Sequence, residues 1–289
     1  MKACASVLIL LLFCLFSCGP REIKPAPKQA KVALVLGAGA SRGFAHIGVL
    51  KVLESNKVPV HMIVGTSAGS FVGSLYAYGF NAFQLQKMSF SLEKGDIIDL
   101  TVPDNGFVRG EKLEEYINTS VMSTPLEKMR IPFYVVATDL QNGQEVVFVK
   151  GNTGKAVRAS CSIPGIFRPV KIENRMYVDG GVVSPVAVDA ARRMGADIVI
   201  AVDIASGIDN VQPDTTIDTM LQAVSIMYSK LTAIQIRRAD VVIRPKVGSI
   251  ASGDFSKKHD AVLEGEKAAL EALPEIQRII AGLRQEGRL

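Results

Sequence analysis

Six consecutive residues, Val64-Gly65-Thr66-Ser67-Ala68-Gly69, carry the pattern G-x-S-x-G. The apolar residues around its start predict a strand over 58–64, and the residues that follow predict a helix over 67–78. A strand, turn and helix in this order are typical of a nucleophile elbow, which presents its serine at the positive end of a helix dipole. Gly65 and Gly69 permit a tight turn and close packing of the strand against the helix. Ser67 is therefore a candidate nucleophile.

A second loop of small residues lies upstream of this turn. The continuous apolar run at 32–36 predicts a buried parallel strand, which leads into Gly37-Ala38-Gly39-Ala40-Ser41-Arg42-Gly43 and a predicted helix over 43–55. Free backbone N–H groups at a helix start suit an anion, either a nucleotide phosphate or a reaction oxyanion. The glycine spacing matches neither G-x-G-x-x-G nor a P-loop, which disfavours a nucleotide-binding protein. Together with Ser67, the loop supplies both halves of an acyl-transfer site.

Apolar runs and helical patterns alternate along the rest of the chain. Further strands are predicted at 133–137, 145–149, 170–172, 175–178, 198–202 and 241–243, and further helices at 155–160, 186–194, 216–237 and 257–286. Residues 82–119 are predicted to be helical in pieces, and their apolar side chains either cover the site or pack in the core. The alternation predicts an α/β fold with a mainly parallel central sheet flanked by helices, in one domain over residues 32–289.

The composition of the 289-residue chain fits a globular protein, with 48% hydrophobic and 21% charged residues. These fractions exclude a mostly disordered chain, and the glycine and proline contents exclude a collagen. The net charge of +5 permits contact with anionic lipid or nucleic acid and requires neither. We expect no nucleic acid partner.

The general base for Ser67 has more than one candidate. Asp179 precedes two glycines at the end of a predicted strand, where α/β sheets gather active sites, so it is either a turn residue or the base. His46 and His61 fall inside a predicted helix and strand and are expected to be structural. A triad of Ser67, Asp179 and His259 also fits the chain order of an α/β-hydrolase esterase. His259, however, precedes a charged helical segment, where a solvated histidine is unremarkable.

Five segments of the sequence resemble the patatin-like phospholipase family, namely residues 34–50, 65–69, 137–140, 158–165 and 179–181. The resemblance implies a three-layer α/β fold and an acyl hydrolase with a Ser–Asp dyad, no catalytic histidine, no metal and no cofactor. It makes Ser67 the nucleophile and Asp179 the general base. It also implies an oxyanion hole drawn from Gly39, Ala40, Ser41, Arg42 and Gly43.

The upstream loop departs from the family's usual pattern, because Ala38 and Ala40 stand where glycine is common. Their backbone N–H groups remain, but a positive φ is costlier for alanine than for glycine. The reaction implied by the resemblance is a two-step hydrolysis that releases fatty acid from a phospholipid or lysophospholipid at a membrane surface. A lipoprotein that keeps the fold and binds lipid without turnover is the non-enzymatic alternative.

The N-terminus has the anatomy of an export signal over residues 1–17, with Lys2 before an apolar run that is too short to span a membrane. Leu15-Phe16-Ser17-Cys18 resembles the lipobox of bacterial lipoproteins, which implies that Cys18 is acylated and becomes the first mature residue. Residues 18–31, rich in proline and basic side chains, then form an extended cationic tether. The expected location is the bacterial cell envelope, held by a lipid anchor, and the outer membrane is compatible with this sequence.

Overall fold

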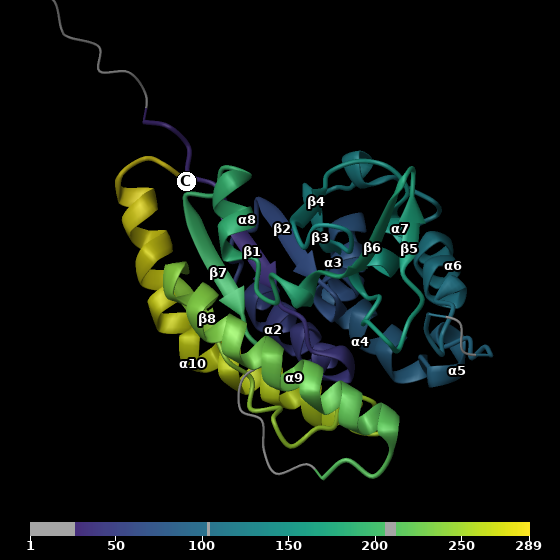
Figure 1. The fold of residues 1–289 in the computed structure, drawn as a ribbon. Helices are drawn as coiled ribbons and strands as arrows, with labels where there is room; N and C mark the ends of the chain where they lie inside the picture. Colours follow the sequence, from purple (N-terminus) through teal and green to yellow (C-terminus); the bar gives the residue numbers. More distant parts are fainter. Residues whose placement is uncertain (1–26, 103–104, 206–211) are drawn as a thin grey trace, which may run out of the picture.

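The computed structural model describes residues 27–102, 105–205 and 212–289 (Figure 1). The predicted signal peptide over residues 1–17, the acylation site Cys18 and most of the tether lie outside the described residues. The described chain is a layered α/β structure, in which a twisted central sheet has helices on both faces.

Within the described residues the sheet has eight strands in the order β5-β6-β3-β2-β1-β7-β8, and β4 pairs with β3 beside this path. The strands are β1 Val32–Leu36, β2 Met62–Thr66, β3 Phe133–Asp139, β4 Glu145–Phe148, β5 Val170–Ile172, β6 Arg175–Asp179, β7 Ile198–Val202 and β8 Val241–Ile243. The central run from β3 to β8 is parallel, whereas β4, β5 and β6 add antiparallel pairs. The predicted α/β fold with a mainly parallel sheet is confirmed, and its antiparallel pairs lie on one side.

The helices that surround the sheet match the predicted segments closely. They are α2 Phe44–Ser55, α3 Ala68–Tyr78, α4 Ala82–Ser91, α5 Lys94–Ile97, α6 Glu111–Ser120, α7 Thr153–Ser160, α8 Val188–Arg193, α9 Thr216–Gln235 and α10 Lys258–Gln285. The segment predicted to be helical in pieces becomes α4, α5 and α6. Among the described helices, none combines the length and hydrophobicity needed to cross a bilayer.

Strand β1 shows why the fold has three layers. All five of its side chains are buried, because successive residues point to opposite faces of a sheet that is covered on both sides. Leu34 and Leu36 pack in the large core beneath α2, α3 and α10. Ala33 and Val35 pack in a smaller core beneath α8. A continuous apolar strand is therefore what this position in the sheet requires.

Two glycines allow the long C-terminal helix α10 to lie directly on α2. A Cβ atom on Gly48 of α2 would lie 1.9 Å from the carbonyl oxygen of Val262. A Cβ atom on Gly265 of α10 would lie 2.0 Å from the carbonyl oxygen of Ala45. Because real Cβ atoms do not approach backbone this closely, the two helices are in backbone contact at this point.

The ends of the parallel strands define two opposite edges of the molecule. At the carboxyl edge β1 opens into the loop before α2, and β2 opens into the turn that carries Ser67. At the amino edge the described part of the tether is bound to the end of the chain, because the Ala30 amide donates to the Arg288 carbonyl oxygen at 2.8 Å. Figure 1 shows this N-terminal segment beside the C-terminus. The described tether therefore enters the fold at the edge opposite Ser67.

One strand boundary differs from the prediction. Strand β2 begins at Met62, whereas the sequence predicts a strand over 58–64. Residues before Met62 serve as a connection instead, since the Val58 amide donates to the Leu53 carbonyl oxygen at the end of α2. The shift also extends β2 to Thr66, directly before the predicted nucleophile.

Candidate active site

The turn after β2 has the strained geometry of an elbow. Ser67 has φ 53° and ψ −122°, a conformation that L-residues rarely adopt. A Cβ atom on Gly65 would lie 2.6 Å from Ser70 Cα, and one on Gly69 would lie 2.0 Å from the Leu36 carbonyl oxygen. The two glycines of the motif are therefore required by close backbone contacts, as the sequence predicts.

Ser160, at the end of α7, fixes this turn. Its Oγ accepts a hydrogen bond from the Ser67 amide at 2.8 Å and donates one to the Val136 carbonyl oxygen at 2.6 Å. Ser160 is fully buried, so both contacts are shielded from water. Sequence analysis missed this role, because a serine late in a short helix has no motif that marks it.

The side chains of Ser67 and Asp179 meet, as the sequence analysis expects. Ser67 Oγ donates a hydrogen bond to Asp179 Oδ2 at 2.6 Å, and the Gly181 amide donates to Asp179 Oδ1 at 2.7 Å. Both carboxylate oxygens are thus engaged, and the Asp179 side chain is fully buried. The contact is direct, with no histidine between the hydroxyl and the carboxylate.

The two glycines after Asp179 explain how the carboxylate reaches Ser67. Asp179 ends β6 and lies opposite Ala137 in the antiparallel pairing of β6 with β3. A Cβ atom on Gly180 would lie 2.3 Å from the Val136 carbonyl oxygen, and one on Gly181 would lie 2.4 Å from the Tyr228 ring. Only glycine therefore fits between the sheet and α9 at this turn.

Burial changes the acidity of Asp179. Removal from water raises the pKa of Asp179 from 3.8 to about 6, although the hydrogen bonds from Ser67 and Gly181 act in the opposite direction. Tyr228 of α9 also stabilises the carboxylate and lowers this pKa. The Tyr228 hydroxyl is buried beside Asp179, although it closes no well-formed hydrogen bond within the described residues. Tyr228 is a second residue that sequence analysis missed.

All three histidines of the folded part are placed away from the dyad contact. His46 Nε2 donates to the Gly37 carbonyl oxygen at 2.8 Å, and burial lowers the pKa of His46 to about 4, so its ring is neutral. His61 Nδ1 accepts a hydrogen bond from the Val32 amide. The ring of His259 lies against Phe90, with centroids 3.9 Å apart. The structure therefore does not assemble the alternative triad.

The loop after β1 supplies two free amides. Among the described residues, the N–H groups of Gly39 and Ala40 have no hydrogen-bond partner, and both residues are partly exposed. The Ser41 amide instead donates to the Ser252 carbonyl oxygen at 3.2 Å, and the Arg42 amide donates to Gly39 at 3.1 Å. Of the five residues predicted for the oxyanion hole, Ser41 and Arg42 thus have amides that are already hydrogen-bonded, whereas the amides of Gly39 and Ala40 remain open to a ligand.

Arg42 and Gly43 shape the site through packing and side-chain contacts. The Arg42 side chain is buried, and its Nε donates to the Ile250 carbonyl oxygen at 2.8 Å. A Cβ atom on Gly43 would lie 2.7 Å from Ala68 Cβ, so the loop lies directly against the elbow. Ala40 has φ +50°, the positive value that the sequence analysis identifies as costly for alanine.

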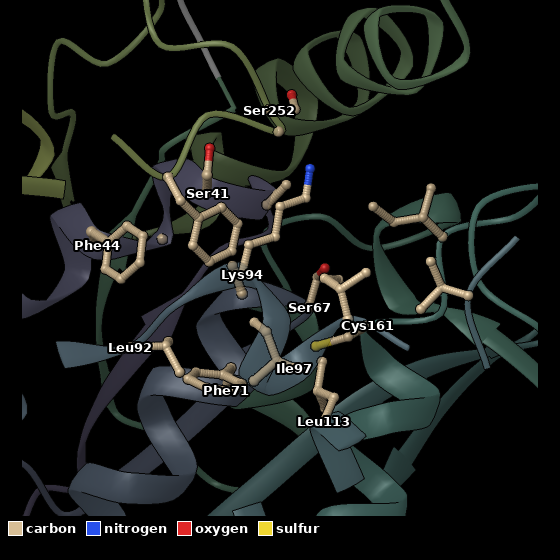
Figure 2. A pocket seen from close by; sticks show the side chains of 18 of the residues that line it. Ser41, Phe44, Ser67, Phe71, Leu92, Lys94, Ile97, Leu113, Cys161 and Ser252 are labelled. Carbon is tan, nitrogen blue, oxygen red and sulfur yellow. The ribbon is translucent and has the colours of Figure 1, made fainter. Parts of the chain in front are cut away.

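An apolar cavity of about 240 Å³ opens beside Ser67 (Figure 2). The loop after β1, the elbow and the α4–α6 segment all contribute to its wall, and α9 adds Ile217 and Leu221. The α4–α6 residues that line it are Leu85, Met88, Ser89, Leu92, Lys94, Ile97, Ile98, Leu100, Phe107, Val108, Leu113 and Tyr116. The sequence predicts that this segment either covers the site or packs in the core. The structure shows both roles, because the segment lines the cavity and several of its side chains also belong to the large core.

Cys161, a free cysteine at the end of α7, also lines the cavity and is buried. Burial raises the pKa of the Cys161 thiol, so it remains protonated. Across residues 27–102, 105–205 and 212–289, no three His, Cys, Asp or Glu side chains are grouped in a way that would hold a metal ion.

Comparison with known sequences identifies relatives that share this region. Residues 34–192 match the family described as patatin-like phospholipase. Lysophospholipase nte1 of Aspergillus fumigatus is 35% identical over 185 residues, which cover 62% of this chain and 12% of the fungal protein. An uncharacterized NTE family protein of Mycobacterium tuberculosis is 32% identical over 208 residues, which cover 68% of this chain and 58% of that protein. The chain thus spans only part of the length of these relatives.

A solved structure supports the fold independently of sequence. VipD from Legionella pneumophila superposes with a TM-score of 0.57, covering 91% of this chain and 72% of VipD, at only 12% identity. At such low identity the likeness concerns the architecture alone. The match over residues 34–192 includes both Ser67 and Asp179 and more than half of the chain. On this basis, the chain belongs to the patatin-like phospholipase family.

Proposed function

We propose that this chain is a serine acyl-ester hydrolase that releases fatty acid from phospholipid or lysophospholipid at a membrane surface. The observation that carries the proposal is the direct hydrogen bond from Ser67 to the buried Asp179 carboxylate beside an apolar cavity. The fungal relative named as a lysophospholipase supports this choice of substrate class.

In the first step Ser67 Oγ attacks the acyl carbonyl carbon while its proton passes to Asp179. The Gly39 and Ala40 amides stabilise the negative oxygen of the tetrahedral intermediate, a role in which one donor contributes roughly 3–4 kcal/mol. The intermediate collapses when the ester C–O bond breaks, and the leaving alcohol takes the proton from Asp179. Ser67 then carries the acyl group as an ester.

In the second step water takes the place of the alcohol. Asp179 accepts a proton from the attacking water, and a second tetrahedral intermediate forms at the same amides. Its collapse releases the fatty acid, and the proton returns to Ser67 Oγ. The raised pKa of Asp179, about 6, makes this carboxylate a stronger base than an exposed aspartate while it remains ionised at neutral pH.

The surroundings of the cavity suit a lipid substrate. The wall is built almost entirely from apolar side chains, which favour an acyl chain over a polar ligand. Leu100 lines the cavity yet is 75% exposed. Exposed apolar side chains at a cavity mouth are consistent with contact to a lipid surface.

The decisive experiment labels the protein with a long-chain fluorophosphonate. The wild-type chain is expected to be labelled at Ser67 and to release fatty acid from a mixed lipid extract, and Ser67→Ala is expected to lose both activities. Asp179→Asn is expected to lose nearly all turnover while remaining folded. Full labelling or hydrolysis in Ser67→Ala would contradict the assignment of the nucleophile.

Two further results distinguish the proposed Ser–Asp dyad from the Ser–Asp–His triad and from a non-catalytic lipoprotein. His259→Ala is expected to retain wild-type turnover, because His259 packs against Phe90 rather than joining the dyad. Loss of turnover in that variant, with the fold intact, would favour the triad. Lipid binding without hydrolysis of any ester in the wild-type protein would instead favour a non-catalytic lipoprotein.

We also propose that Cys18 is acylated and anchors the chain in a bacterial envelope membrane, with the outer membrane compatible with the sequence. The lipobox-like Leu15-Phe16-Ser17-Cys18 and the basic, proline-containing tether support this proposal. Palmitate labelling of the expressed protein tests it. The label is expected to disappear in Cys18→Ala, and an unchanged label in that variant would refute the proposal.

A further inference from the structure

One charged side chain lines the apolar cavity. Among the cavity residues of the described chain, Lys94 is the sole lysine, arginine, aspartate or glutamate. Lys94 begins α5 and is solvent-exposed, so its ammonium group lies toward the open side of the cavity. In Figure 2 the side chain extends between Ser67 and the side of the cavity formed by Ser41 and Ser252.

The neighbouring charged groups are already engaged. The Asp96 carboxylate accepts the Glu93 amide at 2.8 Å, and the Glu93 carboxylate pairs with Lys258 at 3.5 Å. Lys112 donates to the Gly95 carbonyl oxygen at 2.7 Å. For the Lys94 ammonium, by contrast, the described residues provide no hydrogen bond and no ion pair. Its charge is therefore available to a ligand.

The position of Lys94 determines which part of a substrate it meets. With the ester carbonyl at Ser67 and the acyl chain in the apolar interior, the alcohol portion of the ester points to the open side. In a phospholipid or lysophospholipid that portion carries a phosphodiester, joined to the ester by a short glycerol linker. A lysine ammonium is a point charge that binds phosphate oxygens from several directions.

We propose that Lys94 binds the phosphodiester of the substrate and gives the site its preference for phosphate-bearing lipids over neutral acyl esters. This inference rests on the proposed hydrolase function and adds a residue that selects the headgroup side of the substrate. The contact forms in the ground state and in the transition state alike, so it acts mainly on substrate binding. Because Lys94 is exposed, the contact weakens as salt screens it.

The test compares two substrates with the same acyl chain in non-ionic mixed micelles, lysophosphatidylcholine and the neutral monoacylglycerol. Lys94→Met keeps an unbranched side chain that is shorter by one heavy atom, and it removes the charge. Its KM for lysophosphatidylcholine is expected to rise about tenfold, the loss that one charge-assisted contact produces, with little change in kcat. Hydrolysis of the monoacylglycerol is expected to remain unchanged, and Lys94→Arg is expected to restore most of the phosphate preference.

Lys112→Met is the matched control, because it removes a nearby lysine that does not line the cavity. It is expected to behave as the wild type on both substrates. An equal change on both substrates in Lys94→Met, or no change on either, would overturn the inference and leave the hydrolase function intact. Hydrolysis that persists in Ser67→Ala would instead overturn the function itself.

A binding measurement covers the case in which turnover is too slow to compare. In the Ser67→Ala background, displacement of a fluorescent fatty acid reports binding of each lipid without hydrolysis. The added Lys94→Met change is expected to weaken lysophosphatidylcholine binding about tenfold and to leave monoacylglycerol binding unaltered. Equal affinities with and without Lys94 would refute the proposed contact.

Discussion

Ser67 and Asp179 lie 112 positions apart in the chain, and their side chains are joined by a 2.6 Å hydrogen bond inside the protein. The hydroxyl comes from the turn after β2, and the carboxylate comes from the end of β6, which reaches the site through antiparallel pairing with β3. Because the carboxylate contacts the hydroxyl directly, the protonation state of one buried group controls the proposed chemistry.

The first prediction concerns the pH dependence of hydrolysis. Asp179 must be ionised to accept the Ser67 proton, and burial raises its pKa to about 6. The value of kcat/KM is therefore expected to be nearly constant above pH 7 and to fall with an acidic limb centred near pH 6. A pH–rate profile on a soluble ester checks this. An acidic limb near pH 4, the value of an exposed aspartate, would contradict the role of burial.

The second prediction concerns stability rather than rate. Because the pKa of Asp179 is higher in the folded protein than its ordinary 3.8, the folded state binds more protons between about pH 4 and pH 6. The contribution of Asp179 to the free energy of unfolding is therefore largest below this window. It falls as the pH rises through the window, by an amount of order 3 kcal/mol at neutral pH. Asp179→Asn cannot ionise and is expected to unfold at higher denaturant concentration than the wild type at pH 7.

Urea titrations of both proteins at pH 5 and pH 7 measure this difference. The gap between Asp179→Asn and the wild type is expected to widen from pH 5 to pH 7. If the variant were less stable at pH 7, the loss of its contacts with Ser67 and Gly181 would outweigh the cost of the buried charge. A gap that is independent of pH would show that Asp179 does not titrate in this range.

The third prediction concerns Tyr228, whose buried hydroxyl lies beside the Asp179 carboxylate. This hydroxyl lowers the pKa of Asp179, so Tyr228→Phe is expected to move the acidic limb of the pH–rate profile to higher pH and to leave the plateau nearly unchanged. The free energy of unfolding at pH 7 is expected to fall in step with this shift, by about 1.4 kcal/mol for each unit by which the Asp179 pKa rises, because the same hydroxyl stabilises the buried carboxylate.

Tyr177→Phe is the control for this change. Tyr177 lies on the same strand as Asp179, and its ring packs against Phe148 with centroids 5.1 Å apart. It is expected to leave the pH profile in place. Loss of stability in Tyr228→Phe without movement of the acidic limb would assign Tyr228 a purely structural role.

The sequence predicts most of the fold and the pairing of Ser67 with Asp179, because each is marked by a local signal. The apolar runs of β1 and β7 are long enough to identify buried strands, and the glycines beside Ser67 and Asp179 mark turns that only small residues allow. These signals depend on backbone geometry over a few residues, which composition and spacing report directly.

The remaining features of the site depend on contacts between distant segments. Ser160 reaches the Ser67 amide from α7, and Tyr228 reaches Asp179 from α9. The Ser41 amide is engaged by the Ser252 carbonyl oxygen, from a loop far along the chain. No pattern near Ser41 indicates that contact, which is why the sequence alone could not show that the Ser41 amide is already hydrogen-bonded.

The fourth prediction concerns Ser160, which holds the Ser67 amide and the Val136 carbonyl oxygen together. Ser160→Ala removes both contacts and leaves the buried Ser67 amide without its partner, which costs about 1–3 kcal/mol of stability. The turn at Ser67 loses the contact that maintains its strained φ and ψ. A fall in kcat of about tenfold or more is therefore expected, with KM nearly unchanged, because the position of the nucleophile is altered.

Ser162→Ala provides the matched control, since Ser162 Oγ donates to the Arg158 carbonyl oxygen, whereas the Ser162 contact with the Asp179 amide is made by the backbone carbonyl oxygen and is kept in the variant. It is expected to retain wild-type kcat. The rate of fluorophosphonate labelling, measured well below the unfolding temperature, separates the two roles of Ser160. Labelling at the wild-type rate in Ser160→Ala would show that this side chain stabilises the fold without positioning Ser67.

The fifth prediction concerns the positive φ of Ala40 in the oxyanion loop. The left-handed backbone conformation costs an L-residue with a side chain roughly 1–2 kcal/mol, whereas glycine adopts it freely. Ala40→Gly relieves this strain but also gives the unfolded chain more freedom, which offsets about 0.4–1 kcal/mol of the gain. The variant is therefore expected to be as stable as the wild type or more stable by up to about 1 kcal/mol, as measured by urea unfolding.

Activity provides the second half of this test. The Ala40 amide is retained in Ala40→Gly, so kcat is expected to stay within a few-fold of the wild type if that amide serves as an oxyanion donor. Gly282→Ala, at an open position in α10, is a control for the general effect of exchanging glycine and alanine. A large loss of stability in Ala40→Gly would mean that the methyl group makes packing contacts worth more than the backbone strain it imposes.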